Sequence, residues 1–106
     1  MPKYLFESRY TAEGAKGIEK EGGVSRREAV LKHLAQVGGK LEAMYFAFGD
    51  VDCYSIVELP DNVSAAALSL VVNESGEIAS KTVALLTPEE IDQAVKKKIN
   101  FRAPGQ

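Results

Sequence analysis

The chain has 106 residues, of which 45% are hydrophobic and 26% are charged, a composition typical of one globular domain. Its formal net charge of −2 argues against a general nucleic-acid-binding surface, which would make the domain basic. A single cysteine, Cys53, excludes an internal disulfide framework. No apolar run reaches the length of a membrane span, and the N-terminus lacks the apolar core of a signal peptide, so we expect a soluble cytoplasmic protein.

The first third of the chain predicts a strand and a helix. Residues 3–10 alternate with a period of two, and the aromatic face of this strand carries Tyr4, Phe6, Ser8 and Tyr10. A short, loose helical segment is expected from Thr11 to Ile18, before Gly22-Gly23 interrupts the chain. Ser25, with Glu28 three residues later, has the pattern of a capping box and predicts a new helix over residues 25–37.

The middle of the chain predicts a hairpin that leads into another helix. Residues 40–48 and 51–59 have the pattern of strands, joined by a tight turn at Gly49-Asp50. The alternation places one set of side chains on one face of the first strand, namely Met44, Phe46 and Phe48, and a second set on the other face, namely Leu41, Ala43, Tyr45 and Ala47. Pro60-Asp61-Asn62 then begins a helix that runs to about Asn73.

The end of the chain predicts a fourth strand over residues 77–86 and a helix that starts at Thr87, with Pro88 and Glu90 in its first turn. The order of elements predicts a ferredoxin-like α+β fold, in which βαββαβ forms a four-stranded antiparallel sheet and a C-terminal helix is added. We expect one domain over residues 1–98 and a loose tail over residues 99–106.

Apolar side chains occupy both faces of the predicted sheet, although helices in this fold cover one face. Water is therefore an unfavourable neighbour for the second face. A second copy of the chain is the simplest cover, so we expect a homodimer or a higher homo-oligomer.

Several short motifs carry a family resemblance that covers residues 3 to 95. They are Tyr4-Leu5-Phe6, Tyr10-Thr11-Ala12-Glu13-Gly14, Gly39-Lys40-Leu41-Glu42-Ala43, Tyr45-Phe46-Ala47-Phe48-Gly49, Leu59-Pro60-Asp61-Asn62, Lys81-Thr82 and Leu85-Leu86-Thr87-Pro88-Glu89-Glu90. With these motifs the chain resembles the GYD domain family of small bacterial proteins. Val51 is a departure, because family members usually have a tyrosine at this position, so any role of that hydroxyl group is absent here.

The resemblance implies a fold of the dimeric α+β barrel type, in which two ferredoxin-like sheets form a shared barrel. That group includes cofactor-free monooxygenases, haem-handling enzymes and decarboxylase-like enzymes. The GYD family itself implies no general activity, so the resemblance informs the fold far more than the function.

Two residues are candidates for proton transfer. His33 is the only histidine, and histidine exchanges protons near neutral pH, although a half-exposed helical residue is the simpler interpretation. Asp52 follows the hairpin turn together with Asp50, where acidic residues are also common for structural reasons. Cys53 lies inside a strand, where a thiol is usually inert.

Four further residues are candidates for ligand binding. Tyr10 and Tyr45 would shape an aromatic pocket, while Arg26 and Lys81 would hold an anionic group. The alternatives are core or interface packing for the tyrosines, a solvated basic helix face for Arg26, and an aggregation-blocking edge lysine for Lys81.

The leading hypothesis is an oligomeric protein that binds a small anionic or aromatic molecule, with weak cofactor-independent activity as an option. Two alternatives are a structural or regulatory oligomer that binds another protein, and a monooxygenase-like enzyme. We expect no cofactor and no metal, since one histidine and one cysteine form no recognisable ligand set. We also expect no nucleic-acid or membrane partner.

Overall fold

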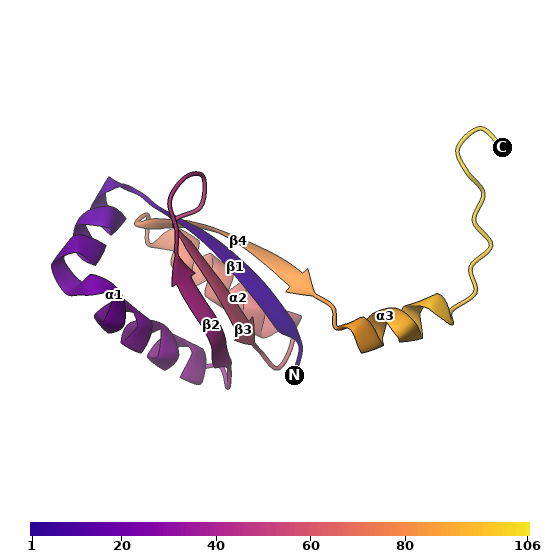
Figure 1. Cartoon of the computed structure of the whole chain (residues 1–106), viewed down its shortest axis with the longest axis horizontal. Helices are drawn as coiled ribbons and strands as arrows, with labels where there is room; N and C mark the ends of the chain where they lie inside the picture. The colour runs from indigo at the N-terminus through magenta and orange to yellow at the C-terminus, as the bar shows by residue number, and fades with distance from the viewer.

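The computed structural model describes all residues from Met1 to Gln106. Its elements are β1 (Lys3–Tyr10), α1 (Ala12–Ala35), β2 (Lys40–Phe46), β3 (Cys53–Glu58), α2 (Asn62–Glu74), β4 (Ile78–Leu85) and α3 (Pro88–Val95). Their order confirms the predicted α+β, ferredoxin-like arrangement, to which α3 is added (Figure 1). None of the helices combines the length and apolar character that a bilayer crossing would need.

The four strands form one antiparallel sheet in the order β2-β3-β1-β4. The central strand, β1, pairs with β3 on one side and with β4 on the other, so that Phe6 lies opposite both Ser55 and Thr82. Helix α1 packs over β1 and β2, whereas α2 packs over β4. Both helices cover one face of the sheet, which we call the inner face; the opposite face is the open face.

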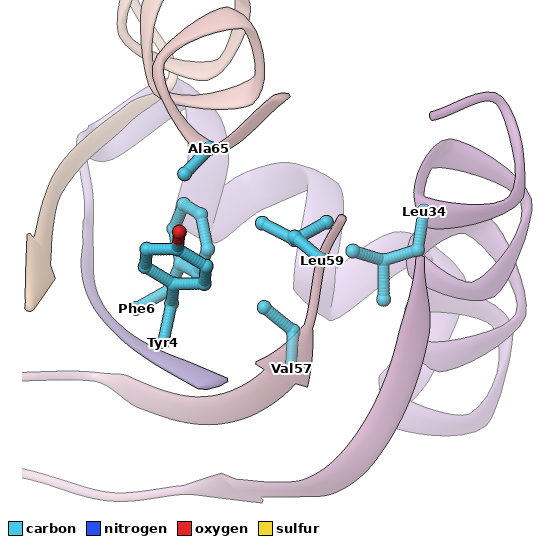
Figure 2. Close-up of a cluster of buried hydrophobic side chains, with 6 residues drawn as sticks. All are labelled: Tyr4, Phe6, Leu34, Val57, Leu59 and Ala65. Carbon is cyan, nitrogen blue, oxygen red and sulfur yellow. The ribbon is translucent and has the colours of Figure 1, made fainter. Parts of the chain in front are cut away.

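The hydrophobic core lies between the inner face and the helices, close to the start of β1. Its buried side chains come from β1, α1, β3, the segment after β3, and α2; they are Tyr4, Phe6, Leu34, Val57, Leu59 and Ala65. Figure 2 shows Leu34 pointing from α1 toward Leu59, while Ala65 points from α2 toward the two aromatic rings. The Tyr4 hydroxyl donates a hydrogen bond to Asn62 Oδ1 at 2.5 Å, which satisfies the polar end of a buried ring.

Helix α1 differs from its prediction. The helical segment runs from Ala12 to Ala35, with a kink at Gly22, whose φ of 82° and ψ of 170° suit only glycine. Ser25 does not cap a new helix, because its hydroxyl donates to the Glu21 carboxylate across the kink. The non-helical backbone at Gly22 therefore separates two helical stretches, as predicted, and the second stretch begins before the expected start at Ser25.

Strand β2 also differs from simple alternation. A β-bulge between Leu41 and Ala43 shifts the register against β3, so that Leu41 lies opposite inward-facing Val57 and packs against the core. Leu41 therefore shares the inner face with Met44, and the prediction that placed it with Ala43 was wrong. The strand ends at Phe46, and residues 47–52 form a longer connection than the predicted tight turn.

Leu59 directly follows β3 and contributes one of the buried side chains of the core. Its side chain is fully buried (0% exposed), whereas Leu70 on α2 is 70% exposed. We expect Leu59→Ala to lower the free energy of unfolding by about 3 kcal/mol, because it removes buried methyl groups and leaves a cavity. Leu70→Ala is the matched control and should change it by less than about 0.5 kcal/mol. Urea unfolding of both variants measures the difference, and equal effects would contradict this placement of the core.

Asp61 is the N-cap of helix α2, and its contribution to stability depends on pH. Its carboxylate accepts a hydrogen bond of 2.9 Å from the Ser64 backbone N–H, which lowers the pKa of Asp61 below its ordinary 3.8. A carboxyl group whose pKa is lower in the folded state stabilises the fold above the unfolded-state pKa, and this contribution is lost as the pH falls through the folded-state value.

We therefore expect the melting temperature of the wild type to fall relative to that of Asp61→Asn as the pH drops below about 4. Asparagine keeps an oxygen acceptor at the cap but does not titrate. Thermal unfolding followed by circular dichroism at a series of pH values measures this. A constant difference between the two proteins from neutral to acidic pH would show that the cap does not titrate as described.

Candidate functional site: a cleft between two helices

A cleft opens between α1 and α2 above the inner face of the sheet. It consists of an inner chamber of about 70 Å³ and an outer chamber of about 300 Å³. The two chambers share lining residues from α1, α2 and β4, namely Arg26, His33, Leu68, Val72 and Ile78. The outer chamber has the size of a small ligand-binding pocket, and the inner one adds room for a few atoms at its base.

Small polar side chains on three neighbouring strands create the inner chamber. Ser8 on β1 lies directly opposite Cys53 on β3 and Ser80 on β4, so the three side chains form a row across the centre of the sheet. The same inward positions nearer the start of β1 carry large apolar residues such as Tyr4 and Phe6. Replacing bulky side chains by serine and cysteine leaves the space between sheet and helices unfilled, which is the physical origin of the hollow.

Helix α1 supplies the charged wall of the cleft. Arg26, Val30 and His33 are spaced four and three residues apart and therefore lie on one face of the helix, toward the cleft. The Arg26 side chain is partly buried, and no carboxylate lies within ion-pair distance of it. The two ion pairs of the chain are Lys3–Glu42 and Lys16–Glu13, both remote from the cleft.

Tyr10 lines the inner chamber. Burial raises the pKa of its hydroxyl well above the usual 10; the neighbouring Cys53 thiol raises it further, while the Arg26 guanidinium acts in the opposite direction. The hydroxyl therefore stays protonated at physiological pH and can donate a hydrogen bond. Its ring lies beside Phe46, with the two ring centroids 6.5 Å apart.

Ser80 has a buried hydroxyl group without a hydrogen-bond partner in the wall of the cleft. Its Oγ atom is buried and has no hydrogen-bond partner, although such groups are normally satisfied. Ser55, another serine on the inner face, differs from Ser80 because its Oγ lies 3.8 Å from the Cys53 sulfur. An unsatisfied hydroxyl in the wall of a hollow is the kind of group that a bound molecule would complete.

The chain matches the family model described as the GYD domain over residues 4–95, which is nearly its whole length. It belongs to the GYD domain family. No curated protein and no solved structure matches it. Membership confirms the resemblance seen in the sequence, and the cleft of this GYD domain is therefore interpreted from its own geometry.

Three of the six sequence-predicted site residues of this GYD domain meet in the cleft. Tyr10, Arg26 and His33 all line the inner chamber. Tyr45 is 72% exposed and lies opposite Tyr54 on the open face, away from the cleft. Lys81 is likewise on the open face, opposite Glu7.

Asp52 has a structural position outside the cleft. Its carboxylate accepts a hydrogen bond of 2.9 Å from the Tyr10 backbone N–H, and its own N–H donates to the Ser8 carbonyl oxygen at 2.9 Å. Its carbonyl oxygen accepts from Ala47 N–H at 2.8 Å. These bonds fix the end of β1 against the loop between β2 and β3, and so they position Tyr10.

Sequence reasoning missed the serines of the chamber floor. Ser8 and Ser80 carry no motif, and Cys53 was interpreted only as a buried thiol. The available signal was the position of small polar residues at inward sites of neighbouring strands, but using it requires the register, which the structure supplies. No group of three or more His, Cys, Asp or Glu side chains is arranged to hold a metal ion.

Ser80→Ala should stabilise the ligand-free protein. Removing a buried hydroxyl that lacks a partner removes its desolvation cost, so we expect the free energy of unfolding to rise by about 1 kcal/mol. Ser55→Ala is the matched control on the same inner face, where the hydroxyl has the Cys53 sulfur as a neighbour, and it should give no such gain. Urea unfolding of the two variants measures both changes. A loss of stability in Ser80→Ala would mean that this hydroxyl is already satisfied.

Proposed function

We propose that this GYD domain binds a small molecule with an anionic end and an apolar body in the cleft between α1 and α2. The observation that carries the proposal is the Arg26 guanidinium, which is partly buried at the junction of the two chambers and has no ion-pair partner. A partly buried cation is favourable when an anion with matching hydrogen bonds accompanies it. A ligand carboxylate would supply both.

The rest of the lining supports an apolar body for this ligand. Ten of the fifteen residues around the inner chamber are hydrophobic, and they come from the sheet and from both helices. The other five lining residues are polar, and among them His33 and Ser80 can donate hydrogen bonds, as can the hydroxyl of Tyr10. A ligand carboxylate held by Arg26 would have hydrogen-bond donors around it. The hydrocarbon part of the ligand would contact side chains such as Leu68 and Val72.

Charged residues of the outer chamber would determine the orientation of the ligand. Glu77 is an exposed acidic residue of its wall, and it would repel an anionic group placed near it. Arg26 attracts the same group toward the junction of the chambers. The anionic end of the ligand is therefore expected beside Arg26, with the apolar body filling the adjoining space.

Benzoate is a suitable probe because it joins a carboxylate to a compact aromatic body, and benzyl alcohol is its uncharged counterpart. We expect benzoate to shift the backbone amide resonances of residues lining the cleft in a saturable manner. Arg26→Gln should weaken benzoate binding about 10- to 100-fold, because it removes a charge-assisted hydrogen bond. Arg27→Gln, at the exposed neighbouring position, should leave the affinity unchanged.

Benzyl alcohol should bind the wild type and Arg26→Gln equally weakly. Equal losses of benzoate affinity in Arg26→Gln and Arg27→Gln would contradict the assignment of Arg26. Benzoate shifts confined to residues outside the cleft would contradict the site itself. Circular dichroism of each variant confirms that the protein remains folded during these titrations.

A further inference from the structure

Ser80 lies on β4, the edge strand of the sheet that packs against α2. Its side chain lines the inner chamber but not the outer one, and its Oγ atom is buried without a hydrogen-bond partner. A serine hydroxyl can donate one hydrogen bond and accept two, and in a folded protein such a group normally finds a partner. A partner for Ser80 would have to come from the space of the inner chamber.

Helix α2 holds the backbone of Ser80 but does not serve its hydroxyl. The Asn73 Oδ1 atom accepts a hydrogen bond from Ser80 N–H at 2.7 Å. The Asn73 Nδ2 group donates to the Ser80 carbonyl oxygen at 3.4 Å and to the Ser69 carbonyl oxygen at 2.9 Å. The Asn73 amide is thus used by backbone groups. These bonds also hold Ser80 in a fixed position, which lowers the entropic cost of binding a group there.

Thr82, the next inward residue of β4, shows the opposite arrangement. Its hydroxyl is hydrogen-bonded to the hydroxyl of Ser69 on α2, so the two polar side chains satisfy each other where the sheet meets the helix. Thr82 does not line the inner chamber, whereas Ser80 does. Of these two inward hydroxyl groups on one strand, the one without a partner is therefore the one at the hollow.

Arg26 and Ser80 reach the inner chamber from different sides. Burial raises the pKa of the Tyr10 hydroxyl most, and the next causes are two neighbouring groups, the Cys53 thiol and the Arg26 guanidinium. Arg26 therefore lies toward the side of the chamber that β3 forms. Ser80 lies two strands away from Cys53, with Ser8 of β1 between them. Because neighbouring strands are about 4.8 Å apart, the backbones of Cys53 and Ser80 are separated by about 10 Å.

We infer that Ser80 binds a hydroxyl group at the end of the ligand opposite to its carboxylate, so that the ligand is a hydroxyaryl acid. This inference rests on the proposed binding of an anion beside Arg26, and it adds a second polar anchor. One carboxylate is too small to contact Arg26 and Ser80 together across the sheet. An aromatic ring is a rigid apolar body that keeps two polar groups apart, and it suits the hydrophobic lining between them.

The surroundings of Ser80 favour an uncharged group at this end of the ligand. None of the residues that line the inner chamber is acidic, so a ligand ammonium group would have no counter-ion there. A second carboxylate would lie away from Arg26, and a buried charge without a close partner is costly. A hydroxyl group carries no charge, occupies little of a chamber of about 70 Å³, and can both donate to Ser80 and accept from it.

The affinities of paired acids test the inference. The hydroxyl group lies at different distances from the carboxylate in para-hydroxybenzoate and meta-hydroxybenzoate, and para- and meta-methylbenzoate carry a methyl group of similar size in its place. In NMR titrations the wild type should bind the better hydroxybenzoate about tenfold more tightly than its methyl counterpart, because the methyl group leaves the Ser80 hydroxyl unpaired. Ser80→Ala should abolish this preference and leave the affinity for benzoate itself unchanged.

Ser55→Ala is the matched control, because it removes a hydroxyl from the same chamber whose Oγ has the Cys53 sulfur as a neighbour. This variant should retain the preference for the hydroxybenzoate. Arg26→Gln should weaken the hydroxy and the methyl acid by the same factor, since Arg26 and Ser80 hold different ends of the ligand. Circular dichroism of each variant shows that it is folded before the titration.

The outcomes distinguish this inference from the proposed function. If benzoate binds through Arg26 but neither hydroxybenzoate binds more tightly than its methyl counterpart, the cleft binds anions and the inference about Ser80 is wrong. A preference that persists in Ser80→Ala would also overturn the inference, because another group would then bind the hydroxyl. If none of the acids binds in the cleft, the proposed function and this inference are both wrong.

Discussion

The fold depends on the antiparallel pairing of β1 with β3 and β4 at the same time. This register brings the inward side chains of three strands into rows, and each row has its own character. The row that joins Tyr4 to Val57 belongs to the core, the next row places Phe6 between Ser55 and Thr82, and the row of Cys53, Ser8 and Ser80 is small and polar. One sheet therefore holds both a packed core and a cleft, and the change from one to the other occurs along a single strand.

Local sequence patterns predicted most of the architecture. The alternation of residues 3–10 and the capping residues Asp61 and Thr87 each marked an element start or face that the structure confirms. These features depend on a few neighbouring residues, so their physical cause is visible in the sequence. The order of elements then left one common topology, the ferredoxin-like one.

The differences between the predicted elements and the structure in α1 and β2 have non-local causes. Gly22 interrupts the helix as predicted, but the first helical stretch is longer than expected. Its start is fixed by a distant segment, since the Glu77 carbonyl oxygen, just before β4, lies so close to Gly14 that a Cβ there would clash. At Glu42 the bulge becomes visible only from pairing with β3. The sequence predicted the charged and aromatic residues of the site, namely Arg26, His33 and Tyr10. It did not predict Ser8 and Ser80, because their proximity follows from which strands are neighbours in the sheet.

Separation of the chamber floor from the core has a consequence for the divergence of such domains. The side chains of Ser8 and Ser80 contribute little to the apolar core, so exchanging them for other small residues would alter the shape of the cavity at small cost in stability. Tyr4, Val57 and Leu59 would meanwhile preserve the fold unchanged. A domain built in this way can acquire a new ligand by a few substitutions on one short row, without passing through unstable intermediates.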